Sequence, residues 1–197
     1  MTLPEPVAIT FANTRSSSRR DRIATLTQWR AWVDAWPGLR VAGHAVDASG
    51  LLAVRATRDD VQLLLRSATG EGQPGRGPTA RLLELARSSS SLDLRWRAGR
   101  LTLAVLPHAA PAALFAQHLA HAAFDLLLTG PPLAACQGQD CLKLFVTSRP
   151  DRRWCDSAVC GNRTRVRAHN RRQQARQTPT LSEEEPPDRR GPQRKVM

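Results

Sequence analysis

Four cysteines at matched intervals constrain the fold of this chain more than any other feature of its sequence. They form two pairs, each with four residues between its members, and 13 residues separate the pairs. Zn²⁺ takes four thiolate ligands in a tetrahedron, and two short cysteine loops brought together in space supply that geometry. A segment of 25 residues cannot bury an apolar core by itself, so metal binding would provide part of its folding free energy. We therefore expect one structural zinc ion, held by Cys136, Cys141, Cys155 and Cys160.

Other uses of the four cysteines are weaker interpretations. Two cysteine pairs also fit an iron–sulfur cluster, although the basic residues and the hairpin expected around them favour zinc. Disulfide bonds are disfavoured in a cytosolic chain. A cytoplasmic protein without a membrane span is expected, because we find no long apolar run and no secretion signal. Four protein thiolates leave no open position on the metal, so no metal catalysis is expected.

The 13 residues between the cysteine pairs are expected to form a hairpin. Residues 142–146 would be one strand, residues 148–151 the turn, and residues 152–154 the returning strand. Phe145 and Trp154 would then shield the metal from water.

The basic charge of the chain is concentrated around and after the cysteines. The formal net charge is +12, which favours polyanionic partners such as nucleic acid. A GC-rich genome also yields arginine-rich chains, so the position of the charge is more informative than its total. Residues 136–177 hold 10 basic and 3 acidic residues, whereas residues 1–135 hold 15 and 10. The cysteine segment stays the more basic one per residue even after the charges of four zinc-bound thiolates are counted.

A basic helix is expected directly after the last cysteine. Residues 164–176 are rich in helix-forming residues and contain no proline. Arginines four residues apart fall on one face of a helix and suit a phosphate backbone, while Asn162 could bond to base edges. The alternative is a solvated arginine-rich helix or the start of a disordered tail. The expected nucleic-acid-binding residues are Arg152, Arg153, Asn162, Arg163, Arg167 and Arg171.

The region before the cysteines mixes helical and extended patterns, which predicts an α+β fold. We expect a strand at residues 7–13, a polar loop at residues 16–22 and a mobile, glycine- and proline-rich loop at residues 69–79. Alternating apolar and polar residues predict a hairpin of strands at residues 92–97 and 101–105. Helices are expected at residues 25–35 with Thr25 as the N-cap, at residues 51–67 with an interruption near Thr57, at residues 80–87, and at residues 111–128, the last packed on the hairpin.

Composition divides the chain into three regions. Prolines at positions 131 and 132 end the last of these helices, and the tail is rich in proline and charge with few large apolar residues. We therefore expect an N-terminal domain of helices and antiparallel strands at residues 6–130. A treble-clef-like four-cysteine finger with its basic helix would follow at residues 133–177, and a disordered tail at residues 178–197.

The cysteine segment resembles the CGNR-type zinc finger. The resemblance rests on both cysteine spacings, on the Arg-Arg-Trp before Cys155, and on the Cys-Gly-Asn-Arg that begins at Cys160. That finger usually follows an ABATE domain in bacterial proteins described as stress-induced transcription regulators. Residues 11–15, Phe-Ala-Asn-Thr-Arg, are similar to the opening strand and Asn-Thr-Arg signature of that domain. The resemblance covers residues 6–172 and implies a role in regulating transcription.

These observations together predict a DNA-binding transcription regulator, without enzymatic activity, whose zinc ion holds the basic helix. Two alternatives stay open: a protein-interaction adaptor whose finger docks on an acidic surface, for example of the transcription machinery, and an N-terminal domain that senses a small ligand. Asn13 and Arg15 are candidate ligand-binding residues for a small anion, although a buried pair that stabilises a turn also fits. A single finger seldom provides enough specificity alone, so a homodimer is a further expectation.

Overall fold

The computed structural model describes residues 5–36, 39–88, 92–97, 100–105 and 110–177. Within them the chain is mostly helical with three antiparallel strand pairs, as expected of an α+β fold. The helices are α1 (Val7–Ala12), α2 (Leu26–Asp34), α3 (Arg40–His44), α4 (Ala48–Ser67), α5 (Arg76–Arg87), α6 (Pro111–Thr129), the π-helical turn η2 (Ser157–Gly161) and α7 (Asn162–Gln177). The strand pairs are β1 (Arg15–Ser17) with β2 (Arg20–Asp21), β3 (Leu92–Arg97) with β4 (Arg100–Val105), and β5 (Leu133–Ala135) with β6 (Leu144–Val146).

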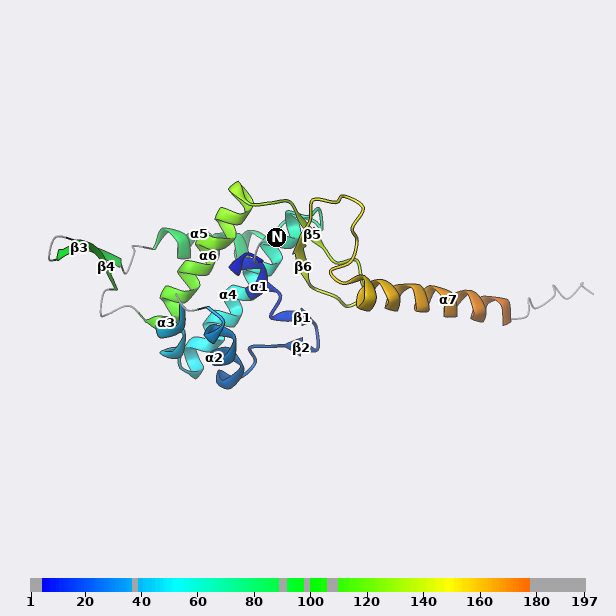
Figure 1. Ribbon diagram of the computed structural model, residues 1–197, viewed down its shortest axis with the longest axis horizontal. Helices are drawn as coiled ribbons and strands as arrows, with labels where there is room; N and C mark the ends of the chain where they lie inside the picture. Colours follow the sequence, from blue (N-terminus) through cyan, green and yellow to red (C-terminus); the bar gives the residue numbers. More distant parts are fainter. Residues whose placement is uncertain (1–4, 37–38, 89–91, 98–99, 106–109, 178–197) are drawn as a thin grey trace, which may run out of the picture.

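Helices α4 and α6 form the centre of the fold (Figure 1). The first halves of both helices meet in one buried cluster, which includes Leu51 of α4 and Phe115 of α6. Their second halves meet in another, which includes Leu65 and Ala123. The two helices therefore run in the same direction, and α1, α2, α3 and α5 pack around them.

The expected start of helix α2, with Thr25 as its N-cap, is confirmed. The Thr25 hydroxyl accepts a hydrogen bond from the Gln28 amide, and the Gln28 side chain accepts one from the Thr25 amide, which together form a capping box. One turn later, Trp29 is fully buried and its indole N–H donates to the Gly43 carbonyl at 2.8 Å. The Trp29 ring also meets Phe115 edge-on at 4.8 Å between centroids. The face of this helix that carries Trp29 and Val33 is thus part of the core.

The strand expected at residues 7–13 is wrong, because Val7–Ala12 forms helix α1. Valine, isoleucine and threonine favour strands by propensity. The buried positions are nevertheless Ala8, Ile9, Phe11 and Ala12, a spacing that places them on one side of a helix rather than alternating as in a strand. Contact with both α4 and α6 stabilises this helical arrangement over the local preference.

Two expected loops and one expected interruption also differ in the structure. Residues 16–22 are not simply a loop, because β1 and β2 form a short hairpin there. The second half of the loop expected at residues 69–79 is the start of α5, where Pro78 sits in the first turn and so displaces no helical hydrogen bond. Helix α4 runs unbroken through Thr57, whose hydroxyl donates to the Ala53 carbonyl at 3.1 Å.

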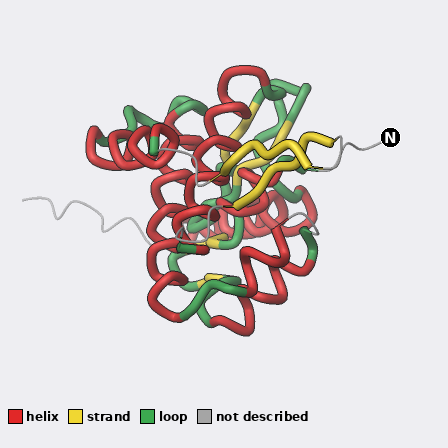
Figure 2. Tube along the Cα trace, turned by 90° about the vertical axis from the view of Figure 1, so that its left-hand side faces the viewer, coloured by secondary structure: helices red, strands yellow, loops and turns green. Residues whose placement is uncertain are grey.

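The expected hairpin of β3 and β4 is confirmed, with Leu94 opposite Leu103 in the antiparallel register. Its turn at residues 98–99 and its side chains lie outside the described part. Helix α6 packs on α4 and α5, and Figure 1 shows the hairpin apart from α6, at the opposite end of the molecule from α7. In Figure 2, which looks from that end, the strand pair stands in front of the helices. The expected packing of this helix on the hairpin is therefore wrong.

Two further expectations concern the C-terminal tail and the presence of a membrane-spanning helix. The tail predicted to be disordered, residues 178–197, lies outside the described residues. Across the described ranges, no helix combines the length and apolar character that a bilayer span requires.

Candidate metal centre and its basic helix

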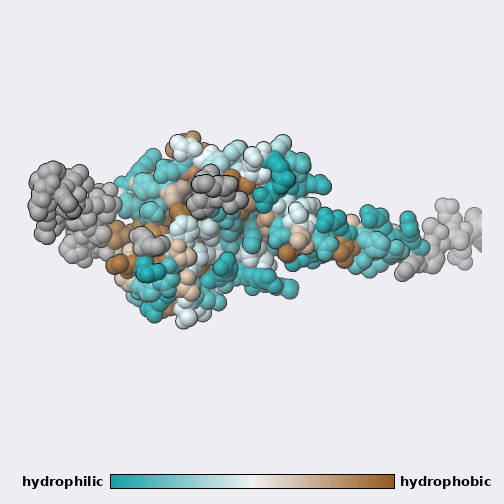
Figure 3. Space-filling view, viewed as in Figure 1, coloured by the Kyte–Doolittle hydropathy of each residue, from teal (hydrophilic) through white to brown (hydrophobic). Residues whose placement is uncertain are grey.

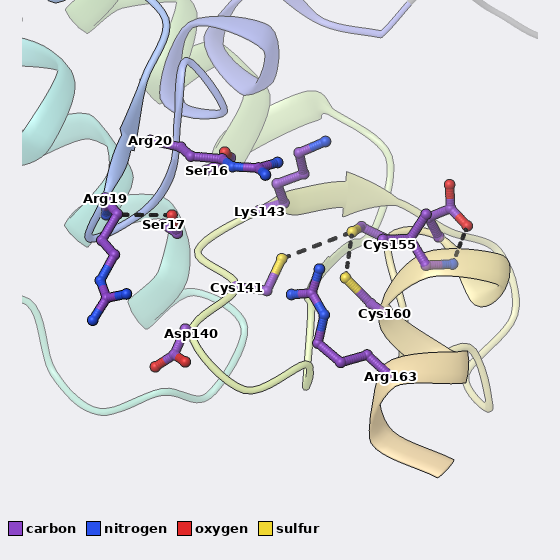
Figure 4. Close-up of a pocket in the computed structure, with 12 residues that line it drawn as sticks. Ser16, Ser17, Arg19, Arg20, Asp140, Cys141, Lys143, Cys155, Cys160 and Arg163 are labelled. Atoms are coloured by element: carbon purple, nitrogen blue, oxygen red, sulfur yellow. Dashed lines mark hydrogen bonds between the residues drawn. The ribbon is translucent and has the colours of Figure 1, made fainter. Parts of the chain in front are cut away.

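The sulfur atoms of the four cysteines converge on one point. All four Sγ atoms lie within 4.8 Å of one another, with 3.9 Å between Cys141 and Cys155 and 3.7 Å between Cys155 and Cys160. Sulfurs bound to a tetrahedral Zn²⁺ at about 2.3 Å would be about 3.8 Å apart, whereas a disulfide bond is only about 2.0 Å long. Figure 4 shows three of these sulfurs directed toward a common centre. The predicted ligand set therefore fits one metal ion, as expected for a single structural zinc.

The first cysteine loop turns tightly between β5 and β6. The Cys136 amide donates to the Lys143 carbonyl at 2.9 Å, and the Cys141 amide donates to the Gly138 carbonyl at 3.0 Å. The Gly138 amide points at the Cys136 sulfur, 3.4 Å away. A Cβ at position 138 would lie 3.2 Å from the Cβ of Cys160 and 3.4 Å from the Cys136 sulfur. Glycine at this position therefore lets the two cysteine loops approach each other.

The second cysteine loop leads directly into the basic helix. The Asp156 carboxylate accepts hydrogen bonds from the amides of Ala158 and Val159, at 2.8 and 3.0 Å, and so caps the π-helical turn η2. The Cys160 amide donates to the Asp156 carbonyl at 2.9 Å. Helix α7 begins two residues after Cys160, at Asn162. The expected order of last cysteine and basic helix is confirmed, and the metal ligand lies in the turn that starts the helix.

The hairpin of the finger pairs differently from the expectation. Strand β6 pairs with β5, so that Phe145 lies opposite Ala134, and not with residues 152–154. The latter segment instead runs beside the first cysteine loop, where the Arg153 carbonyl accepts from the Gln137 amide at 2.9 Å. Phe145 is buried among the cysteines and Trp154 packs against the same cluster. Both rings therefore pack against the cysteines, and their shielding of the metal stays a prediction.

Without a metal, burial and crowding oppose the ionisation of two of the thiols, Cys155 and Cys160. Burial, followed by the neighbouring thiols, raises the pKa of Cys155, and burial is the main cause that raises the pKa of Cys160 to about 11. Burial also opposes ionisation of Cys136, but hydrogen bonds from the backbone amides of Cys155 and Gly138, together with those from the Cys141 and Cys155 thiols, lower its pKa. A bound cation removes this penalty because it stabilises the thiolates directly.

The finger is joined to the N-terminal helices by a shared core and by backbone hydrogen bonds. The Asn13 side chain donates to the Leu144 carbonyl and accepts from the Leu144 amide, both at 2.8 Å. The Leu142 amide donates to the Ser16 carbonyl at 3.0 Å, and the Gln62 side chain donates to the Leu142 carbonyl at 3.3 Å. Leu144 itself is fully buried in the cluster formed by α1, α4, α5 and α6. The finger is thus held against the helices on several sides.

The two candidate ligand-binding residues of the N-terminal part have separate partners. Both polar atoms of the Asn13 amide are engaged by the backbone of Leu144. The Arg15 guanidinium forms an ion pair with Asp59 of α4 at 2.8 Å. The structure therefore gives each side chain a contact that stabilises the fold, and anion binding by this pair stays a prediction.

A buried charge network, which sequence reasoning missed, fixes the β1–β2 hairpin. Arg58 is 1% exposed and pairs with Asp21 at 2.6 Å and with Asp59 at 3.0 Å, while Arg55 pairs with Asp21 at 3.2 Å. Burial alone would raise the pKa of Asp21, but hydrogen bonds from Arg58 and the Ile23 amide, with the charges of both arginines, lower it. The signal in the sequence was Arg58, which stands four residues after Val54 and three before Val61, on the face of the helical pattern where an apolar residue is expected.

Two of the predicted nucleic-acid-binding arginines are engaged inside the finger. The Arg152 guanidinium donates to the carbonyls of Trp154 and Cys155 at 3.2 and 2.9 Å. It also lies 4.4 Å from the centre of the Phe145 ring. Arg167 donates to the Gln139 side chain at 2.7 Å and so ties α7 to the first cysteine loop.

The other four predicted residues are exposed. Asn162, Arg163 and Arg171 lie on α7, and Arg153 stands over the Trp154 ring at 5.6 Å. Helix α7 projects from the body of the molecule (Figure 1), and its surface in Figure 3 is largely hydrophilic. Its 16 residues include six arginines and no acidic residue. The structure therefore presents a long, unshielded basic surface directly beyond the metal centre.

Two protein-family models match the chain. The CGNR zinc finger matches residues 133–173. The ABATE family, described as "Putative stress-induced transcription regulator", matches residues 5–130, which is more than half of the chain. Their order agrees with the resemblance in the sequence. A search of curated proteins found no significant match.

Proposed function

The chain belongs to the ABATE family and ends in a CGNR zinc finger, and from this premise we propose that it is a DNA-binding transcription regulator. In this proposal four cysteines and one zinc ion fix the start of α7, and α7 contacts the phosphate backbone. Four protein ligands leave no position for a metal-bound water, so the metal centre is structural and the finger performs no catalysis.

The observation that carries the proposal is the absence of acidic residues from α7. Arginines four residues apart, such as Arg163 with Arg167 and Arg167 with Arg171, repel one another and destabilise a helix that has no carboxylates. Phosphates along a nucleic acid neutralise such a row and release condensed counterions, which favours binding. The helix therefore gains stability as well as contacts when a polyanion binds.

The exposed arginines are assigned to phosphate contact, and the engaged ones to positioning. Arg153, Arg163 and Arg171 are exposed, and Arg172 and Arg176 extend the basic surface toward the end of α7. Arg152 and Arg167 hold the finger and the helix together. Removal of an exposed arginine should therefore weaken binding without unfolding the protein.

Equilibrium binding to duplex DNA over a salt series, followed by fluorescence anisotropy, tests the proposal. The R171A/R172A variant removes two phosphate contacts, so the slope of log K against log salt should become shallower by about 1.8. The matched control is R30A/R87A, which removes the same charge from exposed positions in α2 and at the end of α5. The complex's stoichiometry tests the expected homodimer.

Unchanged affinity and slope in R171A/R172A would overturn the proposal. A wild-type protein that ignores DNA but binds poly-glutamate at the same ionic strength would instead indicate the adaptor function, because the same arginines would then recognise carboxylates. Thermal unfolding of each variant serves as the control for folding, since exposed substitutions usually change stability by less than about 0.5 kcal/mol.

A further inference from the structure

We propose that the β1–β2 hairpin, together with Lys143, forms a second phosphate-contacting surface that acts with α7 on one nucleic acid. The inference rests on the proposed function, because it assumes that α7 binds the same molecule. It assigns to the N-terminal part a direct role in binding, which a finger acting alone would not require.

A cleft beside the metal centre brings the relevant cations together from three parts of the chain (Figure 4). Arg19 and Arg20 come from the β1–β2 hairpin, Lys143 comes from the segment before β6, and Arg163 comes from α7. In Figure 1 the hairpin lies on the side of the body that faces α7. The cleft therefore connects the hairpin and the basic helix into one surface.

The charges of the cleft are unevenly neutralised. Among the described residues, none of its four cations has a carboxylate within 4.0 Å, whereas Arg15 on the same hairpin is paired with Asp59. The cleft contains two acidic residues, of which Asp156 is occupied in capping η2. A zinc tetrathiolate adds two negative charges, and Figure 4 shows Arg163 directed toward the cysteines. Arg163 thus partly offsets the charge of the metal centre and still lines the cleft with the hairpin arginines and Lys143, where all of them can contact a phosphate backbone.

The hairpin is held rigidly enough to serve as a binding surface. The buried network of Arg58 and Asp21 anchors its second strand, and Arg15 anchors the first. The Ser16 carbonyl accepts from the Leu142 amide, which links the hairpin directly to the finger. Little conformational entropy is then lost when both basic surfaces engage one ligand, and this pre-organisation favours affinity.

The cleft suits the backbone of a nucleic acid better than a small metabolite. The cleft is lined largely by polar and charged residues and lacks the mainly apolar lining of the usual small-molecule pocket. A free phosphorylated metabolite would also reach only the cleft, whereas a phosphodiester chain presents phosphates at regular intervals to both the hairpin and α7. We therefore commit to nucleic acid as the occupant.

The R19A/R20A variant tests this surface in the salt series used for α7. Loss of two phosphate contacts should make the slope shallower by about 1.8, so that the loss of affinity between about 50 and about 200 mM salt becomes about 12-fold smaller. The R19K/R20K variant keeps the charges and should keep the wild-type slope. The R30A/R87A variant again controls for net charge, and it should also keep the wild-type slope because those residues contact no phosphate.

The outcomes separate this inference from the proposed function. If wild-type protein does not bind DNA, both fail. If R171A/R172A lowers the slope but R19A/R20A matches R30A/R87A, the proposed function stands and the second surface is overturned. A lysine variant that loses as much slope as the alanine variant would also overturn it, since phosphate contact requires only the charge. Arg19 and Arg20 are exposed, so thermal unfolding should be the same in all variants.

Discussion

Helices α4 and α7 are both rich in arginine, yet their arginines have opposite environments. In α4, Arg58 is buried between two aspartates, and Arg55 and Arg66 also pair with carboxylates. In α7 no acidic residue is available within the helix, and most of the arginines face solvent. The comparison teaches that arginine content alone does not identify a binding surface. What matters is whether the fold brings a carboxylate within reach.

The same contrast occurs within the β1–β2 hairpin over only a few residues. Arg15 meets Asp59 of α4, whereas Arg19 and Arg20 at the other end of the hairpin have no carboxylate partner among the described residues. Arginines that face α4 thus stabilise the fold, and those that face the finger remain free for a ligand.

Metal removal should have the largest effect on DNA binding, because the metal centre fixes the start of α7 and its loss leaves the arginines of α7 without a fixed position. Structural zinc contributes an apparent free energy of about 10–16 kcal/mol in finger peptides. We expect chelation to abolish DNA binding, and Zn²⁺ alone to restore it, as measured by anisotropy on the full chain. The C160S variant should behave like the chelated protein. Wild-type affinity and salt slope in metal-free protein would show that α7 needs no finger.

Substitution of the buried Arg58 tests whether the arginines of α4 stabilise the fold. The substitution Arg58→Met removes the fully buried guanidinium and leaves Asp21 paired with Arg55 alone, so the free energy of unfolding should fall by about 3 kcal/mol. Urea unfolding measures this loss, and Arg171→Met is the matched exposed control, expected to change stability by less than about 0.5 kcal/mol. Equal losses in the two variants would contradict the distinction between the helices.

The pH dependence of stability should follow from Asp21. Because its pKa is lowered from 3.8 in the folded state, its stabilising contribution is present above that value and is lost as the pH falls through the folded pKa. Wild-type stability should therefore decrease over this acidic range. The decrease should be smaller in Arg58→Met, which lacks the main favourable partner, and an identical pH profile would rule out this origin.

The contact between the finger and the N-terminal helices should respond to Asn13. The substitution Asn13→Ala removes two hydrogen bonds to Leu144 and should cost about 2 kcal/mol. Hydrogen exchange at the Leu144 amide should accelerate with it. Asn13→Asp keeps the acceptor and loses the donor, so an intermediate effect is expected. Equal protection in all three proteins would mean that apolar packing alone holds the finger.

The smallest expected effect concerns the helix content of α7. Each pair of arginines four residues apart costs about 0.2–0.5 kcal/mol of helix stability. Higher salt should therefore increase helicity in far-UV circular dichroism, and DNA should increase it further. Arg172→Glu converts the repulsive pair with Arg176 into an attractive one and should raise helicity at low salt. No change in this variant would indicate that the finger alone stabilises the helix.

The features that were predicted correctly depend on residues close together in sequence. Cysteine spacing identified the metal ligands, Thr25 and Gln28 marked the start of α2, and strict alternation gave the β3–β4 hairpin. The errors arose where distant contacts decide. Residues 7–12 are helical because α4 and α6 bury one side of them. Strand β6 pairs with β5 rather than with residues 152–154 for a similar reason, since Leu144 is drawn into the N-terminal core.

The amino-acid sequence alone was sufficient to identify the four metal ligands, the basic helix that follows them and the family resemblance. Each of these depends on residue spacing within a short segment. The sequence could not distinguish Arg58, which is buried and paired, from Arg171, which is exposed, or show that Arg152 binds carbonyls within the finger. Only the tertiary structure decides which arginines meet carboxylates or carbonyls, because those partners come from elements far apart in the chain. The free energy of a buried charge depends on the distance in space between the charge and its partner, and the fold sets that distance.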